Sequence, residues 1–169
     1  MAELRFNHED HALYGKMDAA IQDLASASSY GGFILKKGWK AKPWSRGSTY
    51  LQQSAFVTAM VVSYSRAFTR SDGWPKLPKE LLELYSEDES RIHRRTLELR
   101  HKLYAHSDAV NYGVIPFQSD WHTDIQMHPV FELPHEEISA IKAMCRKMIL
   151  GIKQRMIDIK QSYLIDGHD

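Results

Sequence analysis

The stretch PHEEISAIKAMCRKMILGIKQRMIDIKQSYL, residues 134–164, decides the fold class. Apolar side chains recur along it at three- and four-residue steps, at Ile138, Ile141, Cys145, Met148, Ile152, Met156 and Ile159. This near-heptad spacing puts them on one face of an α-helix, with charged residues over much of the remaining surface. The pattern therefore predicts a helix of roughly 45 Å that buries one side against other helices.

Further helices are predicted upstream of this one. Residues 10–28 have an amphipathic pattern, and we expect the serine- and glycine-rich run SASSYGG, 26–32, to end that helix. Residues 50–69 are apolar nearly all round, which is typical of the most buried helix of a bundle. A short helix is expected at 78–85, and the acidic residues 87–89 with Ser90 favour the start of another helix.

The helical pattern vanishes between residues 107 and 134. Prolines, valines and aromatic residues there indicate extended or irregular structure, and connections of this length are often functional. The whole pattern predicts an all-α protein, a four- to five-helix up-and-down bundle with a long irregular insertion before the last helix. With 169 residues, we expect a single domain over 1–169.

Composition sets limits on the environment of the chain. Lys and Arg number 22 against 21 Asp and Glu, so the total charge predicts no partner. One cysteine, Cys145, excludes an intramolecular disulfide and suits a reducing compartment. The N-terminal residues lack a secretory pattern and the apolar runs are short, so we expect a soluble, cytoplasmic protein without membrane contact. Without an HExxH or CxxC motif, we also expect no metal or cofactor.

The segment RRTLELRHKLYAHSD, residues 94–108, carries the most specific motif. Five residues separate Arg100 from His106 in this segment, with a polar His101 directly after the arginine and Ala105 directly before the histidine. This resembles the Arg-x4–6-His motif of HEPN domains, helical bundles found in RNA-cleaving toxins, abortive-infection phage-defence proteins and CRISPR-associated ribonucleases. The sequence SYSRAF, 63–68, in the preceding helix is similar to the abortive-infection branch.

The resemblance implies metal-independent cleavage of single-stranded RNA. A guanidinium binds phosphate oxygens in a bidentate fork, and an imidazole exchanges protons near neutral pH. We therefore assign Arg100 to the scissile phosphate and its developing charge, and His106 to general acid or base catalysis. His101 is a third catalytic candidate, because it could orient the phosphate or donate a proton.

Helical geometry separates the two motif residues. Six residues of continuous helix leave Arg100 and His106 about 120° apart and about 9 Å apart along the axis. Three arrangements would bring the two side chains together. Either the helix loosens before His106, or Arg100 reaches along the surface, or a second chain completes the site. The family works as dimers with a composite cleft, so we expect a homodimer.

Some HEPN toxins carry, where this chain has Asp108, a tyrosine that a partner nucleotidyltransferase modifies, so control by that route is not expected here. The sequence has no Gly-rich nucleotidyltransferase motif and no P-loop motif, so any antitoxin or regulator is expected to be a separate protein.

Local charge points to RNA in a way that total charge does not. Residues 24–71 contain no acidic residue, and tryptophans alternate with cations there. Such a pattern is typical of surfaces that stack bases and contact phosphates. The RNA-binding candidates in this window are Lys36, Lys37, Trp39, Lys40, Lys42 and Arg46. The alternative is a solvated loop that its tryptophans fix to the bundle.

Two residues of the motif helix complete the candidate site. His93 lies seven residues before Arg100, nearly above it on the helix, and Tyr104 lies one turn after it, so both are expected to line the RNA cleft. Two other functions stay open. One is a non-catalytic HEPN module that binds a protein or nucleotide partner, and the other is a helical partner-binding protein outside the family.

Overall fold

A computed structural model of the chain describes residues 6–42, 47–70, 73–104, 114–118, 123–127 and 133–165. The described part is an all-α bundle of the predicted kind, with one added β-hairpin. Its elements in chain order are α1 (His8–Lys37), α2 (Thr49–Phe68), the 3-10 helix η1 (Lys79–Leu84), α3 (Glu87–Tyr104), β1 (Val114–Gln118), β2 (Thr123–Met127) and α4 (His135–Ile165).

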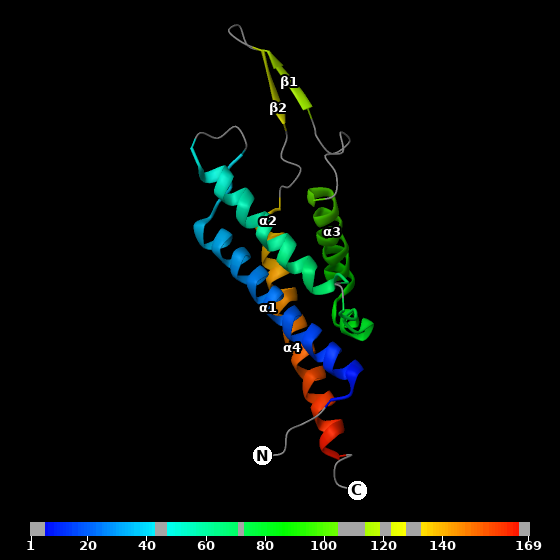
Figure 1. The fold of residues 1–169 in the computed structure, drawn as a ribbon. Helices are drawn as coiled ribbons and strands as arrows, with labels where there is room; N and C mark the ends of the chain where they lie inside the picture. The colour runs from blue at the N-terminus through cyan, green and yellow to red at the C-terminus, as the bar shows by residue number, and fades with distance from the viewer. Residues whose placement is uncertain are drawn as a thin grey trace.

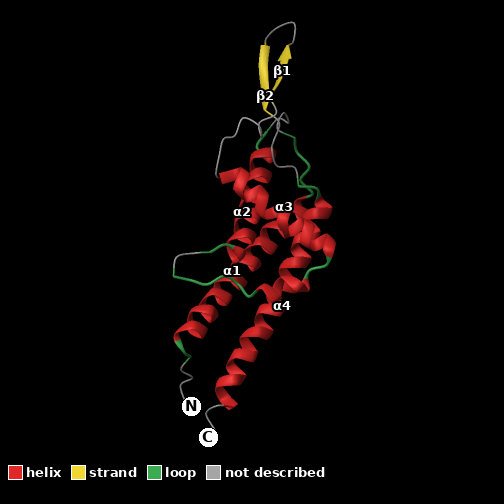
Figure 2. Cartoon of the chain, turned by 90° about the vertical axis from the view of Figure 1, so that its right-hand side faces the viewer, coloured by secondary structure: helices red, strands yellow, loops and turns green. Residues whose placement is uncertain are grey.

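The four α-helices run alternately up and down. In Figure 1, α1 rises from the end of the bundle that carries both termini, α2 descends, α3 rises and α4 descends again. The hairpin projects from the opposite end, as Figure 2 shows after a quarter turn. Moderate connections join α1 to α2 and α2 to α3, whereas the long insertion joins α3 to α4. None of the described helices has an apolar run long enough to cross a bilayer.

The core lies between α1, α2 and α4. Met17 and Leu24 from α1, Met60 and Tyr64 from α2, and Met148 from α4 are all fully buried. The apolar stripe that predicted α4 is buried almost throughout, and Cys145 lies within it as a small core residue. Burial raises the pKa of its thiol to about 12, so the thiol is protonated at neutral pH.

The first helix is longer than the sequence indicated. The prediction that SASSYGG ends it is wrong, because α1 runs through that segment to Lys37. Gly31 is buried there, and a Cβ on it would lie 3.0 Å from Sδ of Met60 and 3.2 Å from Cγ2 of Ile138. The small residue therefore permits close helix packing. The helix ends instead at Gly38, whose φ of 64° suits a left-handed C-cap.

The described part of the insertion is extended, as its valines and aromatic residues predicted, and it is more regular than expected. Strands β1 and β2 pair antiparallel, with Val114 opposite Met127 and Gln118 opposite Thr123. An antiparallel pair satisfies the backbone hydrogen-bonding groups that face each other. The rest of the segment 107–132 lies outside the described residues.

Candidate functional site

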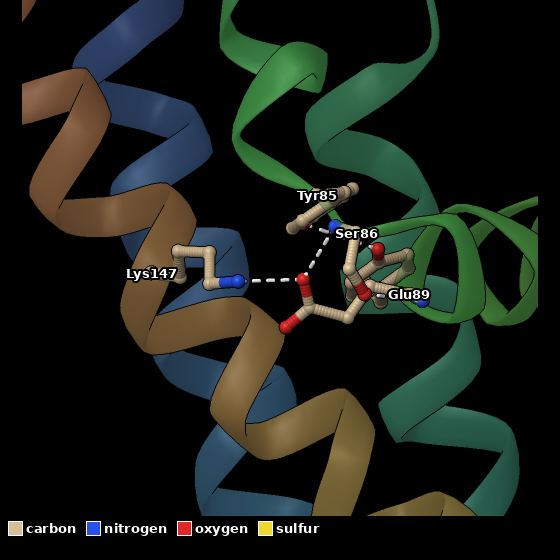
Figure 3. Close-up of polar contacts among 5 residues, drawn as sticks. Tyr85, Ser86, Glu89 and Lys147 are labelled. Atoms are coloured by element: carbon tan, nitrogen blue, oxygen red, sulfur yellow. Dashed lines mark hydrogen bonds and ion pairs between the residues drawn. The ribbon is translucent and has the colours of Figure 1, made fainter.

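Helix α3, which carries the motif, begins with a capping box. The backbone N–H of Glu89 donates to Oγ of Ser86 at 3.2 Å, and the N–H of Ser86 donates to Oε2 of Glu89 at 2.8 Å. Figure 3 shows Lys147 of α4 pointing at the same carboxylate, with Nζ 2.5 Å from Oε2. The hydrogen bond from Lys147 holds the pKa of Glu89 below its usual value, so the Glu89 carboxylate is charged at neutral pH.

A second ion pair joins α3 to α4. Nη1 of Arg95 lies 2.8 Å from Oε2 of Glu137, a carboxylate that is largely buried. Arg91, by contrast, pairs with Asp88 on the exposed surface of α3. The two contacts with α4 fix both the first turn and the middle of α3. They therefore set the orientation of the motif helix within the bundle.

The structure places two of the three catalytic candidates, Arg100 and His101, near the end of α3. Arg100 is partly exposed and His101 is exposed, so solvent and ligands reach both side chains. His106 lies outside the described residues, as does the side chain of Tyr104. The distance between Arg100 and His106 therefore stays a prediction. The three arrangements that would bring them together, a loosened helix, an extended arginine or a second chain, all stay open.

His93 lies inside the bundle, although it belongs to the same helix. Its side chain is 8% exposed, and Nδ1 lies 2.9 Å from the hydroxyl of Tyr64. The rings of Phe68 and Tyr85 pack against the imidazole, with centroids 4.6 Å and 5.7 Å away. Burial, assisted by the nearby charge of Arg94, lowers the pKa of His93 to about 4. The imidazole is therefore neutral at pH 7 and part of an aromatic cluster.

The basic loop after α1 is partly exposed and partly packed. Lys36, Lys37 and Lys40 are exposed, and Nζ of Lys37 lies 5.4 Å from the ring centroid of Phe33. Trp39 is half-buried, with its ring 5.6 Å from that of Phe33 and 5.7 Å from that of Phe56. These ring contacts fix the loop to the bundle, as expected for the alternative of a solvated loop that its tryptophans hold in place.

The same tryptophan also lines an open pocket of about 390 Å³. Lys40 and Lys42 contribute cations to its lining, which also includes His135 and the carboxylate of Glu136. Nε2 of His135 lies 2.8 Å from the carbonyl oxygen of Trp39, which ties this loop to the start of α4. Packing and ligand access therefore coexist at Trp39. Arg46, the last candidate of this loop, lies outside the described residues.

A second cationic and aromatic surface was missed by the sequence analysis. Between α2 and η1, Arg70, Trp74 and Lys76 surround an open depression of about 430 Å³. Trp74 is 41% exposed. The signal was present in the sequence RSDGWPKLPK, 70–79, where a tryptophan lies among cations as it does at Trp39.

The comparisons with other proteins do not add a relative. No family model matches the chain, and neither the curated proteins nor the solved structures include a significant match. Among the described residues, no three His, Cys, Asp or Glu side chains lie close enough together to share a metal ion. The case for a function therefore depends on the residues of the site itself.

Proposed function

We propose that the protein is a metal-independent endoribonuclease of HEPN type that cleaves single-stranded RNA in the cytoplasm, as part of a toxin or phage-defence system. The supporting observation is the accessibility of Arg100 and His101 on a helix that two ion pairs fix to α4. A rigid helix with an accessible guanidinium can hold a phosphate in a constant position, which transition-state stabilisation requires.

The proposed reaction uses the 2′-hydroxyl of RNA as the nucleophile. A base removes its proton, the 2′-oxygen bonds to the adjacent phosphorus, and the bond from phosphorus to the 5′-oxygen breaks as an acid protonates that oxygen. His106 supplies one of the proton transfers and Arg100 neutralises the charge that develops on the phosphate. The products carry a 2′,3′-cyclic phosphate and a 5′-hydroxyl, and His101 assists as a positioning group or proton donor.

A homodimer completes the proposed site. Each chain offers one motif histidine, whereas the reaction needs both an acid and a base, so two copies around one cleft supply both. The cationic and aromatic surfaces at Trp39 and Trp74 would guide the strand through phosphate contacts and base stacking. Any antitoxin or other regulator would be a separate chain.

The test is cleavage of a mixed panel of single-stranded RNAs in EDTA. We expect the wild type to leave cyclic-phosphate ends. Arg100→Ala is expected to lose about 10²–10³-fold in rate, as happens when one charge-stabilising donor is removed. His106→Ala is expected to lose about 10²–10⁴-fold, and His101→Ala less than either.

Arg91→Ala is the matched control. It removes an arginine from the same helix, but one whose guanidinium pairs with Asp88 on the surface. Cleavage at the wild-type rate by this variant, together with unchanged circular dichroism for all variants, would attribute the losses to the site. Wild-type protein that cleaves no RNA in the panel, or an Arg100→Ala variant as active as Arg91→Ala, would contradict the proposal and favour a non-catalytic binding module.

A further inference from the structure

A separate pocket of about 270 Å³ lies between η1 and α3, and we call it the η1–α3 pocket. Apolar side chains make most of its wall, among them Phe68 from α2, Leu81 from η1 and Leu97 from α3. The volume is slightly below the roughly 300–1,000 Å³ of typical small-molecule sites, so it accommodates one ring system rather than an extended ligand.

One buried polar group lines this apolar space. His93 is 92% buried, its Nδ1 is engaged with Tyr64, and Nε2 has no hydrogen-bond partner among the described residues. Among the described residues, Oγ of Ser65 is the one fully buried side-chain polar atom without a partner, so Nε2 of His93 retains some contact with solvent. The η1–α3 pocket, which His93 lines, therefore offers a ligand one specific hydrogen bond inside a mainly apolar wall.

His93 can either donate or accept the hydrogen bond to a ligand, depending on which ring nitrogen carries the proton. The hydroxyl of Tyr64 lies 2.9 Å from Nδ1 of His93 and 3.3 Å from the hydroxyl of Tyr85. If Tyr64 donates to Nδ1, then Nε2 carries the proton and donates to the ligand. If Tyr64 donates to Tyr85, then Nδ1 carries the proton and Nε2 accepts. Nucleobases present both donors and acceptors on their edges, so either tautomer finds a partner.

The pocket also carries positive charge and lies along the motif helix. Lys76 and Lys79 are exposed residues of its lining, and Lys76 also borders the depression at Trp74. On α3, His93 and Arg100 are seven residues apart, which puts them on nearly the same line about 10.5 Å apart along the axis. A strand held by Arg100 would therefore pass close to this pocket.

We propose that the η1–α3 pocket binds the base of an RNA nucleotide near the cleaved phosphate, with His93 on the base edge and Lys76 and Lys79 on the backbone phosphate. This inference rests on the proposed function, since it assigns a subsite to the same RNA. The apolar wall suits the base, whose ring leaves water when it binds, and the two lysines suit the phosphate.

Two exposed leucines of η1 provide a matched pair for the test. Leu82 lines the pocket and Leu84 does not, and their exposed fractions are 38% and 43%. Leu82→Glu puts a carboxylate beside the ligand, and Leu84→Glu puts the same charge on the same helix away from it. Binding of the four ribonucleoside 5′-monophosphates is measured by calorimetry, and we expect at least one to bind the wild type and Leu84→Glu equally but Leu82→Glu about tenfold more weakly.

The RNA arm uses a short single-stranded oligonucleotide with one abasic nucleotide moved stepwise along it. Binding is measured with His106→Ala, so that cleavage does not interfere. We expect one abasic position to weaken binding, and Leu82→Glu to remove that position dependence. Lys79→Ala is expected to weaken RNA binding, in contrast to Lys153→Ala, which removes an exposed lysine of α4.

The outcomes separate the two proposals. RNA cleavage with no position dependence, and no difference between Leu82→Glu and Leu84→Glu, would overturn the subsite and leave the ribonuclease intact. Position-dependent binding without any cleavage would support the subsite and contradict the ribonuclease. Monophosphate binding with no abasic effect would show that the pocket takes a free nucleotide, which contradicts a role in RNA binding.

Discussion

At Gly31 three helices approach one another so closely that a methyl group has no free space. An added Cβ would lie 3.0 Å from Met60, 3.1 Å from Lys142 and 3.2 Å from Ile138, so one of these side chains must move. Gly15 of the same helix has no atom within 4 Å of the corresponding position. The two glycines therefore have opposite roles, close packing at one and only added chain entropy at the other.

The first prediction compares alanine at these two glycines. We expect Gly31→Ala to lower the free energy of unfolding by about 1–3 kcal/mol through overpacking. Gly15→Ala should raise it by about 0.5–1 kcal/mol, because alanine favours the helix. Urea denaturation followed by circular dichroism measures both values. Equal effects of the two substitutions would contradict the close packing at Gly31.

The second prediction concerns the acid sensitivity of the buried His93. Its pKa is about 4 in the folded protein and near 6.5 in an unfolded chain, so between these values only the unfolded chain binds the proton. Stability is therefore lost as the pH falls from 6.5 to 4, by up to about 3 kcal/mol. Glu137 acts in the opposite direction, because burial raises its pKa.

Comparison of two histidine variants isolates this effect. His93→Gln keeps a hydrogen-bonding group near Tyr64 but does not titrate, so its unfolding free energy should fall less between pH 6.5 and 4 than that of the wild type. His101→Gln, at an exposed position of the same helix, should behave like the wild type. Denaturation curves across this pH range give the slopes, and parallel slopes for wild type and His93→Gln would argue against a buried neutral imidazole.

At the scale of the element, the capping box decides where α3 begins. The acidic start signal placed the helix correctly at Glu87, while the residue that caps it is Ser86 and not Ser90. Glu89 has a double role, because the same carboxylate caps the helix and binds Lys147 of α4. The local signal for a helix start thus also fixes α3 against its neighbour.

The third prediction tests the cap with two serines. Ser86→Ala should lower the free energy of unfolding by about 1 kcal/mol, since a backbone N–H loses its acceptor. Ser90→Ala, four residues later, should have little effect, because only its backbone N–H makes a hydrogen bond to Ser86. Thermal and urea unfolding of both variants provide the comparison, and a larger loss for Ser90→Ala would refute the observed cap.

At the scale of the whole molecule, the up-and-down order brings several functional candidates to the end of the bundle away from the termini. The last described turns of α3, the start of α4 and the loop after α1 all lie toward that end, from which the hairpin projects (Figure 1). His93 lies further down α3, and Trp74 and Lys76 lie in the connection that leads to η1. A strand that follows α3 would meet both groups in turn.

The fourth prediction follows from the proposed composite site. Sedimentation should give a homodimer, twice the 19.5 kDa of one chain. Mixing the wild type with an excess of His106→Ala under exchange conditions should lower the cleavage rate by more than dilution, because a heterodimer keeps one motif histidine and therefore lacks either the acid or the base. A fully active monomer, or a mixture whose rate falls only in proportion to dilution, would contradict a site shared between two chains.

The sequence by itself determined the helices and most of their limits, because apolar periodicity and capping residues act within a few turns of the chain. It also put the candidates Arg100 and His101 on one helix, and the structure adds that Arg100 is partly exposed and His101 exposed. Only the tertiary structure decided that SASSYGG stays helical, since the packing of Gly31 against two other helices outweighs its local tendency to turn. The tertiary structure likewise decided that His93 faces Tyr64 and a pocket. The sequence gives the side of the helix on which His93 lies, but the residues that pack against that side come from distant parts of the chain.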